Sequence, residues 1–185
     1  MIRHPNILKR GSAALLIIDV QERLVPVMKD MEAVEQNIIR LIEGCKLLGV
    51  PAFYTEQYSK GLGQTIPSIK ENLDGIEPVE KLHFSVCCEK ELMHQLREKG
   101  YQQLIVVGIE SHVCVLQSAL DLMQEGFQTH VVVDAVSSRK SLDKEISLQR
   151  MVTQGATLST TESVLFELVK VAGSSEFKQI SKLVK

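Results

Sequence analysis

The hydrophobic positions of the chain follow two different periods, and the two alternate along the sequence. Short continuous runs of small and β-branched apolar residues are typical of strands buried on both faces. Such runs occupy residues 13–19, 51–55, 79–82, 102–108, 129–134 and 156–159. Between them, apolar residues recur at helical spacing over residues 31–48, 88–99, 113–125, about 142–153 and 161–171. Gly49 and Gly100 favour helix ends at their positions.

This alternation of strands and helices predicts a parallel sheet covered by helices on both faces. We therefore expect residues 1–185 to form a single α/β domain, a doubly wound, Rossmann-like, six-stranded parallel sheet sandwiched by helices. The loop over 56–65 is polar and long for a strand-to-helix connection, which is typical of functional or surface loops. The tail over 174–185 is weakly amphipathic and is expected to pack on the domain or on a neighbouring molecule.

The composition excludes several classes of protein. An apolar fraction of 44% with 24% charged residues is typical of a folded globular domain. The net charge of −2, with basic and acidic residues interspersed, and the absence of Trp predict no nucleic-acid partner. No apolar stretch approaches the roughly 20 residues of a membrane span, so we expect no membrane partner.

The cysteines and the N-terminal residues bear on location. The four cysteines, at 45, 87, 88 and 114, fit neither a disulfide framework nor a zinc-ligand pattern, which favours the reducing cytoplasm. Residues 1–10 are basic but have no apolar core, so a secretory signal is not expected. The same residues also fit a short mitochondrial presequence.

Three reactive side chains follow predicted strands. Asp19 closes the first apolar run, Lys81 follows the run around Val79, and Cys114 comes just after Gly108, in the first turn of a predicted helix. Ligands of such sheets bind beyond the carboxyl ends of the strands, where these residues would meet. The N–H groups and dipole of a helix start favour a thiolate at Cys114.

Each of these residues also has an ordinary structural interpretation. Most free cysteines are small core residues, so Cys114 alone is weak evidence for catalysis. Asp19 fits a turn, and a lone lysine such as Lys81 is usually a solvated surface residue. The catalytic interpretation gains weight only from the three positions jointly.

The chain resembles the isochorismatase-like cysteine hydrolase superfamily over nearly its whole length. The matching motifs are Leu16-Ile-Ile-Asp19-Val-Gln21, Val79-Glu-Lys81-Leu-His-Phe84-Ser85, and Gly108-Ile-Glu-Ser-His-Val-Cys114 followed by Ala119-Leu-Asp-Leu. The resemblance implies an Asp–Lys–Cys triad of Asp19, Lys81 and Cys114 that hydrolyses a small amide or related C–N or acyl compound through a thioester. It also implies an oxyanion hole formed by the backbone N–H groups of Glu110 and Cys114, with a cis Ile109–Glu110 peptide bond.

Some residues of this chain differ from those of known family members, and these differences bear on the expected substrate and cofactor. Nicotinamidases carry a metal-binding Asp-x-His motif after the second strand, whereas this chain reads Tyr54-Thr-Glu-Gln-Tyr58, without histidine. Glu56 alone does not supply a metal site, so we expect no metal and no organic cofactor. Isochorismatases proper lack the cysteine, so Cys114 shifts the expected chemistry from vinyl ethers to amides or acyl compounds.

Further residues are candidates for substrate contact, although His112 fits a role in orienting the turn equally well and Gln21 a role in bracing the first loop. The candidates are Gln21, Tyr54, Glu56, Gln57, Phe84, Ile109 and His112.

We expect a small-molecule substrate. We also expect a homo-oligomer, because many relatives form dimers or rings. The main alternative is an interaction scaffold that keeps the triad without turnover. A nuclease is a third alternative, but the sequence shows no basic stripe to support it.

Overall fold

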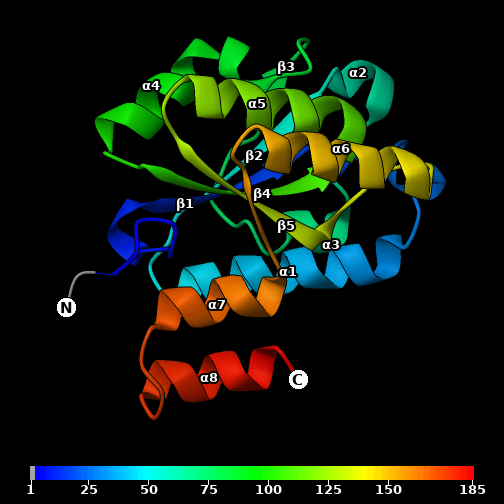
Figure 1. Ribbon diagram of the computed structural model, residues 1–185. Coiled ribbons are helices and arrows are strands. Elements are labelled where there is room, and N and C mark those ends of the chain that lie inside the picture. The colour runs from blue at the N-terminus through cyan, green and yellow to red at the C-terminus, as the bar shows by residue number, and fades with distance from the viewer. Residues whose placement is uncertain (1–2) are drawn as a thin grey trace.

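The computed structural model describes residues 3–185 and shows one six-stranded parallel sheet. The strands are ordered β3-β2-β1-β4-β5-β6, so the chain reverses its direction of winding between β1 and β4 (Figure 1). Their bounds are Ala13–Ile18 (β1), Ala52–Gln57 (β2), Val79–Lys81 (β3), Gln103–Ile109 (β4), Gln128–Ser137 (β5) and Thr157–Ser159 (β6). The predicted α/β fold is confirmed.

Helices cover both faces of the sheet (Figure 1). α4, α5 and α6 cover one face, α1 and α7 cover the other, and α8 packs on α7 and α1 as an outer layer. Their bounds are Met31–Leu47 (α1), Ser59–Leu62 (α2), Pro67–Lys70 (α3), Lys90–Glu98 (α4), Leu116–Gln124 (α5), Ser141–Thr153 (α6), Thr161–Val169 (α7) and Ser175–Leu183 (α8). Within residues 3–185, no helix has both the length and the apolar character needed to cross a bilayer.

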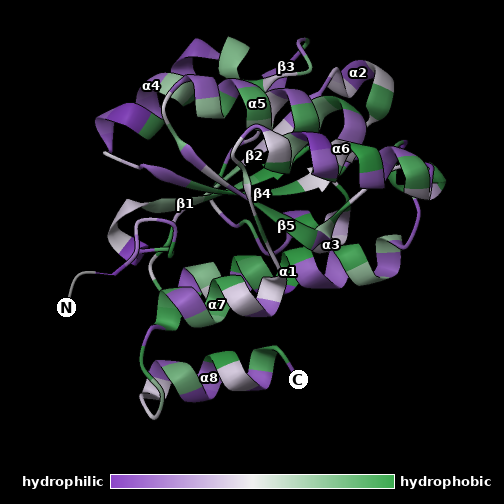
Figure 2. Ribbon diagram, in the orientation of Figure 1, coloured by the Kyte–Doolittle hydropathy of each residue, from purple (hydrophilic) through white to green (hydrophobic). Residues whose placement is uncertain are grey.

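Burial on both faces explains the continuous apolar runs of the strands. Along β1, Leu15 and Ile17 pack toward α1 and α7, whereas Leu16 and Ile18 pack toward α4 and α5. Every residue of β1 is therefore buried, and none needs to be polar until Asp19. In Figure 2 the strands in the middle of the molecule are mostly hydrophobic, whereas the helices on either side carry both hydrophilic and hydrophobic residues.

The structure corrects several predicted boundaries. β5 runs to Ser137 rather than ending at 134. β2 continues to Gln57, because Glu56 and Gln57 pair with Glu80 and Lys81 of β3, so the loop expected from residue 56 begins later and contains α2. The helix expected from 113 begins as a π-helical turn, Ser111–Val115, and α5 starts only at Leu116. The helix expected from 88 begins with a 3-10 turn, Val86–Cys88, ahead of α4.

Gly108 brings β4 unusually close to β1 beside the end of the sheet. Its φ is +112°, and a Cβ built on it would lie 2.1 Å from the carbonyl oxygen of Ile18. Only glycine can occupy this position without moving the backbone. The close approach places the turn that follows β4 next to the residue that follows β1.

Candidate active site

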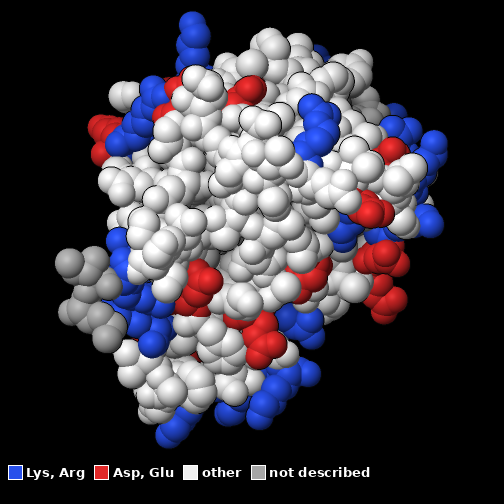
Figure 3. Space-filling view, viewed as in Figure 1, with Lys and Arg blue, Asp and Glu red and all other residues white. Residues whose placement is uncertain are grey.

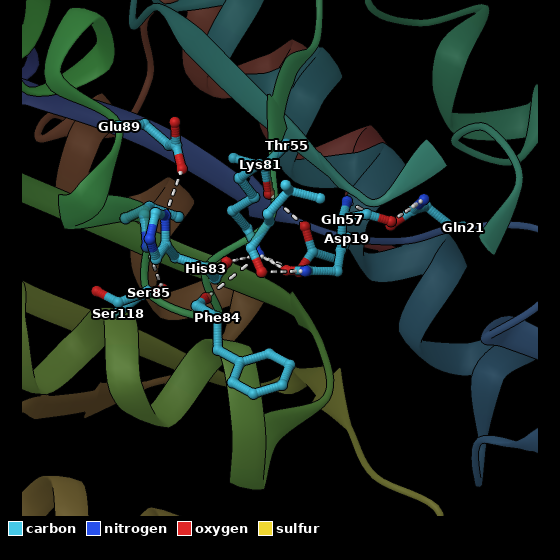
Figure 4. A network of polar contacts seen from close by, with 12 residues as sticks. Asp19, Gln21, Thr55, Gln57, Lys81, His83, Phe84, Ser85, Glu89 and Ser118 are labelled. Carbon is cyan, nitrogen blue, oxygen red and sulfur yellow. Dashed lines mark hydrogen bonds and ion pairs between the residues drawn. The ribbon is translucent and has the colours of Figure 1, made fainter. Parts of the chain in front are cut away.

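The carboxyl ends of four adjacent strands gather the three predicted reactive residues. Asp19 follows β1, Lys81 is the last residue of β3, and Cys114 lies in the turn after β4. The intervening β2 contributes Thr55 and Gln57 (Figure 4). The site therefore spans the β1–β4 boundary, where ligands of doubly wound sheets bind.

Asp19 and Lys81 form a buried ion pair. Lys81 Nζ lies 2.6 Å from Asp19 Oδ2, and both side chains are 0% exposed. The ammonium also donates to Gln57 Oε1 at 2.7 Å and lies 3.2 Å from the carbonyl oxygen of Phe84 and 3.3 Å from that of His83. A buried charge pair is tolerated only where further hydrogen bonds satisfy it, and these contacts supply them.

The Asp19 carboxylate has a second fixed partner. The hydroxyl of Thr55 donates to Asp19 Oδ1 at 2.6 Å, so each carboxylate oxygen accepts one short hydrogen bond. The Asp19 N–H donates to the Thr55 carbonyl, and its φ of +52° turns the chain out of the strand. Thr55 was not among the predicted site residues, because only the pairing of β1 with β2 reveals that it lies beside Asp19.

Two glutamines hold the ammonium side of the site. Gln57 Nε2 donates to the Leu82 carbonyl at 2.7 Å, which turns the Gln57 amide oxygen toward Lys81. The Gln21 side chain accepts from the Gln57 N–H at 2.8 Å and donates to the carbonyls of Gln57 and Gly63. Gln21 therefore braces the end of β2 against the following loop.

Cys114 lies 5% exposed in the core cluster that contains Ile18 and Val115. Burial raises the pKa of its thiol, and the negative charge of Asp19 and a hydrogen bond to it raise this pKa further, while Lys81 opposes them. Burial and an α5 that begins only at Leu116 both oppose the thiolate that a helix start would favour. These surroundings favour a neutral thiol beside the Asp19 carboxylate.

The turn between β4 and Cys114 has the expected backbone. The Ile109–Glu110 peptide bond is cis, as the family resemblance implied. The Glu110 carbonyl accepts from the N–H groups of Val113 and Val115 at 3.0 and 3.2 Å. The assignment of the Glu110 and Cys114 N–H groups to an oxyanion hole stays a prediction.

The other candidate contact residues lie in different surroundings. Tyr54 and Ile109 belong to the core cluster on the α1 and α7 face, whereas Cys114 belongs to the opposite one. Glu56 Oε1 accepts from the Thr65 N–H at 2.7 Å and so closes the loop. Phe84 is half exposed, and its ring points away from Lys81 (Figure 4). Of the predicted contact residues, Gln57 is the one whose side chain hydrogen-bonds directly to the Asp19–Lys81 pair.

The arrangement can carry acid–base and nucleophilic chemistry. A thiol, a carboxylate that can accept its proton, and an ammonium that holds the carboxylate occupy one site. Among residues 3–185, no three His, Cys, Asp or Glu side chains are grouped as metal ligands.

Sequence comparisons connect the chain to known proteins. Residues 13–163 match the model of the isochorismatase domain family. Isochorismatase domain-containing protein 2 of Danio rerio is 39% identical over 178 residues, which cover 96% of this chain and 89% of that protein. The secreted isochorismatase effector Isc1 of Phytophthora sojae is 37% identical over 180 residues, covering 94% and 85% of the two chains.

Solved structures share the fold. The MAR1 ribonuclease from Caenorhabditis elegans superposes with a TM-score of 0.89 at 38% identity, over 96% of this chain and 91% of that one. YcaC from Escherichia coli, described as an octameric hydrolase of unknown specificity, superposes with a TM-score of 0.90 at 23% identity, over 98% and 92% of the chains.

Proposed function

The chain belongs to the isochorismatase domain family, and on that premise we propose that it is a cysteine-dependent hydrolase acting through Cys114, Asp19 and Lys81. Its substrate would be a small amide or a related C–N or acyl compound. The observation that carries the proposal is the buried Asp19–Lys81 pair beside the Cys114 thiol. Burying an ion pair without water costs stability. Such costly pairs are typical of catalytic sites, where the Asp19 carboxylate would act as the base.

The proposed reaction begins with proton transfer. Asp19 takes the thiol proton as the Cys114 sulfur attacks the substrate carbonyl carbon, forming a carbon–sulfur bond and an oxyanion. The backbone N–H groups of Glu110 and Cys114 would stabilise that oxyanion. Asp19 then gives the proton to the leaving amine as the carbon–nitrogen bond breaks, which leaves a thioester.

Water completes the cycle. Asp19 accepts a proton from water, the hydroxide oxygen attacks the thioester carbonyl, and the carbon–sulfur bond breaks to release a carboxylic acid. The proton held by Asp19 returns to the sulfur, which restores the resting thiol. Throughout, Lys81 keeps the Asp19 carboxylate oriented and offsets the negative charge that develops on sulfur.

We also propose that the protein is cytoplasmic and acts on a small molecule without a cofactor. We further propose that it self-associates, which the description of YcaC as octameric supports. Light scattering of the purified protein tests the last point, with multiples of the 20.7 kDa chain mass expected. A monomer at micromolar concentration would contradict self-association and leave the chemistry to be tested separately.

A panel of simple amides with ammonia detection tests the chemistry. Cys114→Ser and Asp19→Asn should lower ammonia release by about a thousandfold or more, because nucleophile and base act as one unit. Cys88→Ser is the matched control, because this exposed thiol lies outside the site. Release that survives Cys114→Ser would reject the mechanism, and a folded protein inactive on every compound would favour the scaffold alternative.

Ribonuclease activity is a second candidate, favoured by the 38% identity to the C. elegans MAR1 ribonuclease. On the face shown in Figure 3, however, Lys and Arg are scattered among acidic and uncharged residues rather than gathered in a stripe. We therefore expect no cleavage of a labelled RNA above that of the Cys114→Ser variant. Cleavage lost in that variant, and weakened by salt, would favour the ribonuclease.

A further inference from the structure

The segment after β5 contacts the turn that carries Cys114. The Ser138 hydroxyl lies 2.8 Å from the Ser111 hydroxyl and 3.0 Å from His112 Nδ1. Ser138 is 1% exposed and Ser111 is 0% exposed, so the bond between the two hydroxyls is shielded from water, whereas the His112 ring is partly exposed. Two residues of the nucleophile turn therefore share one buried hydroxyl.

The two hydrogen bonds of the Ser138 hydroxyl are linked through the tautomer of His112. His112 Nε2 lies 4.0 Å from the Asp143 carboxylate, which is beyond hydrogen-bond distance. A serine hydroxyl donates only one hydrogen. With the hydrogen on Nε2, Ser138 donates to His112 and accepts from Ser111; with the hydrogen on Nδ1, Ser138 accepts from His112 and is free to donate to Ser111. In both cases the Ser138 hydroxyl links the Ser111 and His112 side chains.

The same segment also holds the chain that follows Asp19. The Ser138 carbonyl accepts from the Lys29 N–H at 3.1 Å, and the Ser137 hydroxyl donates to the Lys29 carbonyl. At the rim, Arg139 Nε donates to the Glu110 carboxylate at 2.8 Å. Residues 137–139 thus connect the nucleophile turn with the segment that leaves the proposed base.

We propose that His112 and Ser138 are positioning residues that fix the turn from Glu110 to Cys114 relative to Asp19. Both ring nitrogens of His112 face the segment from Ser138 to Asp143, which supports positioning rather than proton transfer to substrate. The inference rests on the proposed hydrolase function. It adds that the positions of the Cys114 thiol and of the N–H groups in its turn depend on contacts from Ser138, just after β5, which is not part of the triad.

The test compares His112→Ala and Ser138→Ala with the wild type and with His94→Ala, a control whose side chain is 71% exposed on α4. Each of the first two should lower kcat by about 10- to 100-fold with little change in KM, because small displacements of reacting groups have effects of this size. His112→Asn should recover most of kcat, because its amide group can accept from or donate to the Ser138 hydroxyl in place of Nδ1. His94→Ala should match the wild type.

A double-variant cycle identifies the shared network. His112→Ala combined with Ser138→Ala should be no slower than the slower single variant, since either change breaks the same contact. Losses that multiply, or failure of His112→Asn to recover activity, would overturn the proposal, as would folded single variants within about twofold of wild type. If a variant does not fold, Ser111→Ala must show the same loss.

The rate of Cys114 alkylation by iodoacetamide, followed by mass spectrometry of each cysteine, separates this inference from the proposed function. It needs no substrate. Altered alkylation in His112→Ala and Ser138→Ala, with His112→Asn near wild type, supports the network even if no amide is hydrolysed. Unaltered alkylation together with unaltered turnover rejects it while the triad stands.

Discussion

At the scale of single residues, Cys114 is held between opposing influences. Burial and the Asp19 carboxylate raise the pKa of the thiol, whereas the Lys81 ammonium lowers it. In the proposed reaction the thiol therefore needs a partner that accepts its proton during attack, and Asp19 is that partner. Reactivity would then depend on proton transfer during attack rather than on a thiolate formed beforehand.

The pH dependence of Cys114 alkylation should reveal this environment. Because the pKa of the thiol is raised, the thiolate fraction stays small at neutral pH, so alkylation should be slower than at the exposed Cys88 and should keep rising with alkaline pH. Asp19→Asn removes a cause of the raised pKa and should move the profile to lower pH. A profile that moves to higher pH in that variant would contradict the assigned electrostatics.

The buried ion pair gives a stability prediction. Lys81→Met leaves the Asp19 carboxylate buried without its cation and should lower the free energy of unfolding by about 3–5 kcal/mol. The double variant Lys81→Met with Asp19→Asn removes both charges and should recover part of that loss. Urea unfolding of the three proteins measures it, and a double variant less stable than Lys81→Met alone would contradict the buried pair.

At the scale of elements, the site depends on how β1 and β4 approach each other. The two strands pair from Ala13 to Ile18, and Gly108 lies against Ile18 at the end of the register. β4 and β5 then shift register beyond Val106. The close approach and the shift together set where the Cys114 turn and the Ser138 segment begin.

Gly108→Ala should therefore be strongly destabilising. Its Cβ would meet the Ile18 carbonyl oxygen at 2.1 Å, and we expect a loss of about 2–4 kcal/mol together with reduced turnover. Gly49→Ala is the matched control, since Gly49 also has a positive φ, +68°, but nothing lies within 4 Å of its Cβ; about 1 kcal/mol is expected. Equal losses in thermal unfolding would contradict the steric argument.

At the scale of the whole molecule, one arginine joins the N-terminal segment to the two last helices. Arg10 donates to the carbonyls of Leu168 and Val169 at the end of α7 and forms two hydrogen bonds with Glu176 on α8. It precedes β1, so it lies at the end of the sheet opposite to the candidate site. Helix α8 is thus attached at the end of the sheet that lies away from the candidate active site.

Arg10→Ala should loosen α8 without affecting catalysis. Amide hydrogen exchange across residues 175–183 should become faster, while kcat stays within about twofold of wild type. Lowering the pH should also speed exchange across α8 in the wild type. The hydrogen bond from Arg10 lowers the pKa of Glu176, so the pair is present at neutral pH and is lost when Glu176 is protonated. Unchanged exchange in the variant would show that apolar packing alone holds α8.

The sequence by itself determined the fold class and indicated the candidate reactive positions. Hydrophobic periods are local properties, so the six strands and the main helices could be predicted from them. Because the ends of parallel strands meet at one edge, Asp19, Lys81 and Cys114 could be expected to converge. The cis bond before Glu110 came from family resemblance alone.

Only the tertiary structure decided the surroundings of those residues. Thr55 joins Asp19 because β2 pairs with β1, and Tyr54 is a core residue because its side of β2 faces α1. The raised pKa of the Cys114 thiol and the Ser138 contact likewise depend on segments distant in sequence. Burial and strand pairing are long-range properties, and the local pattern of hydrophobic positions does not specify them.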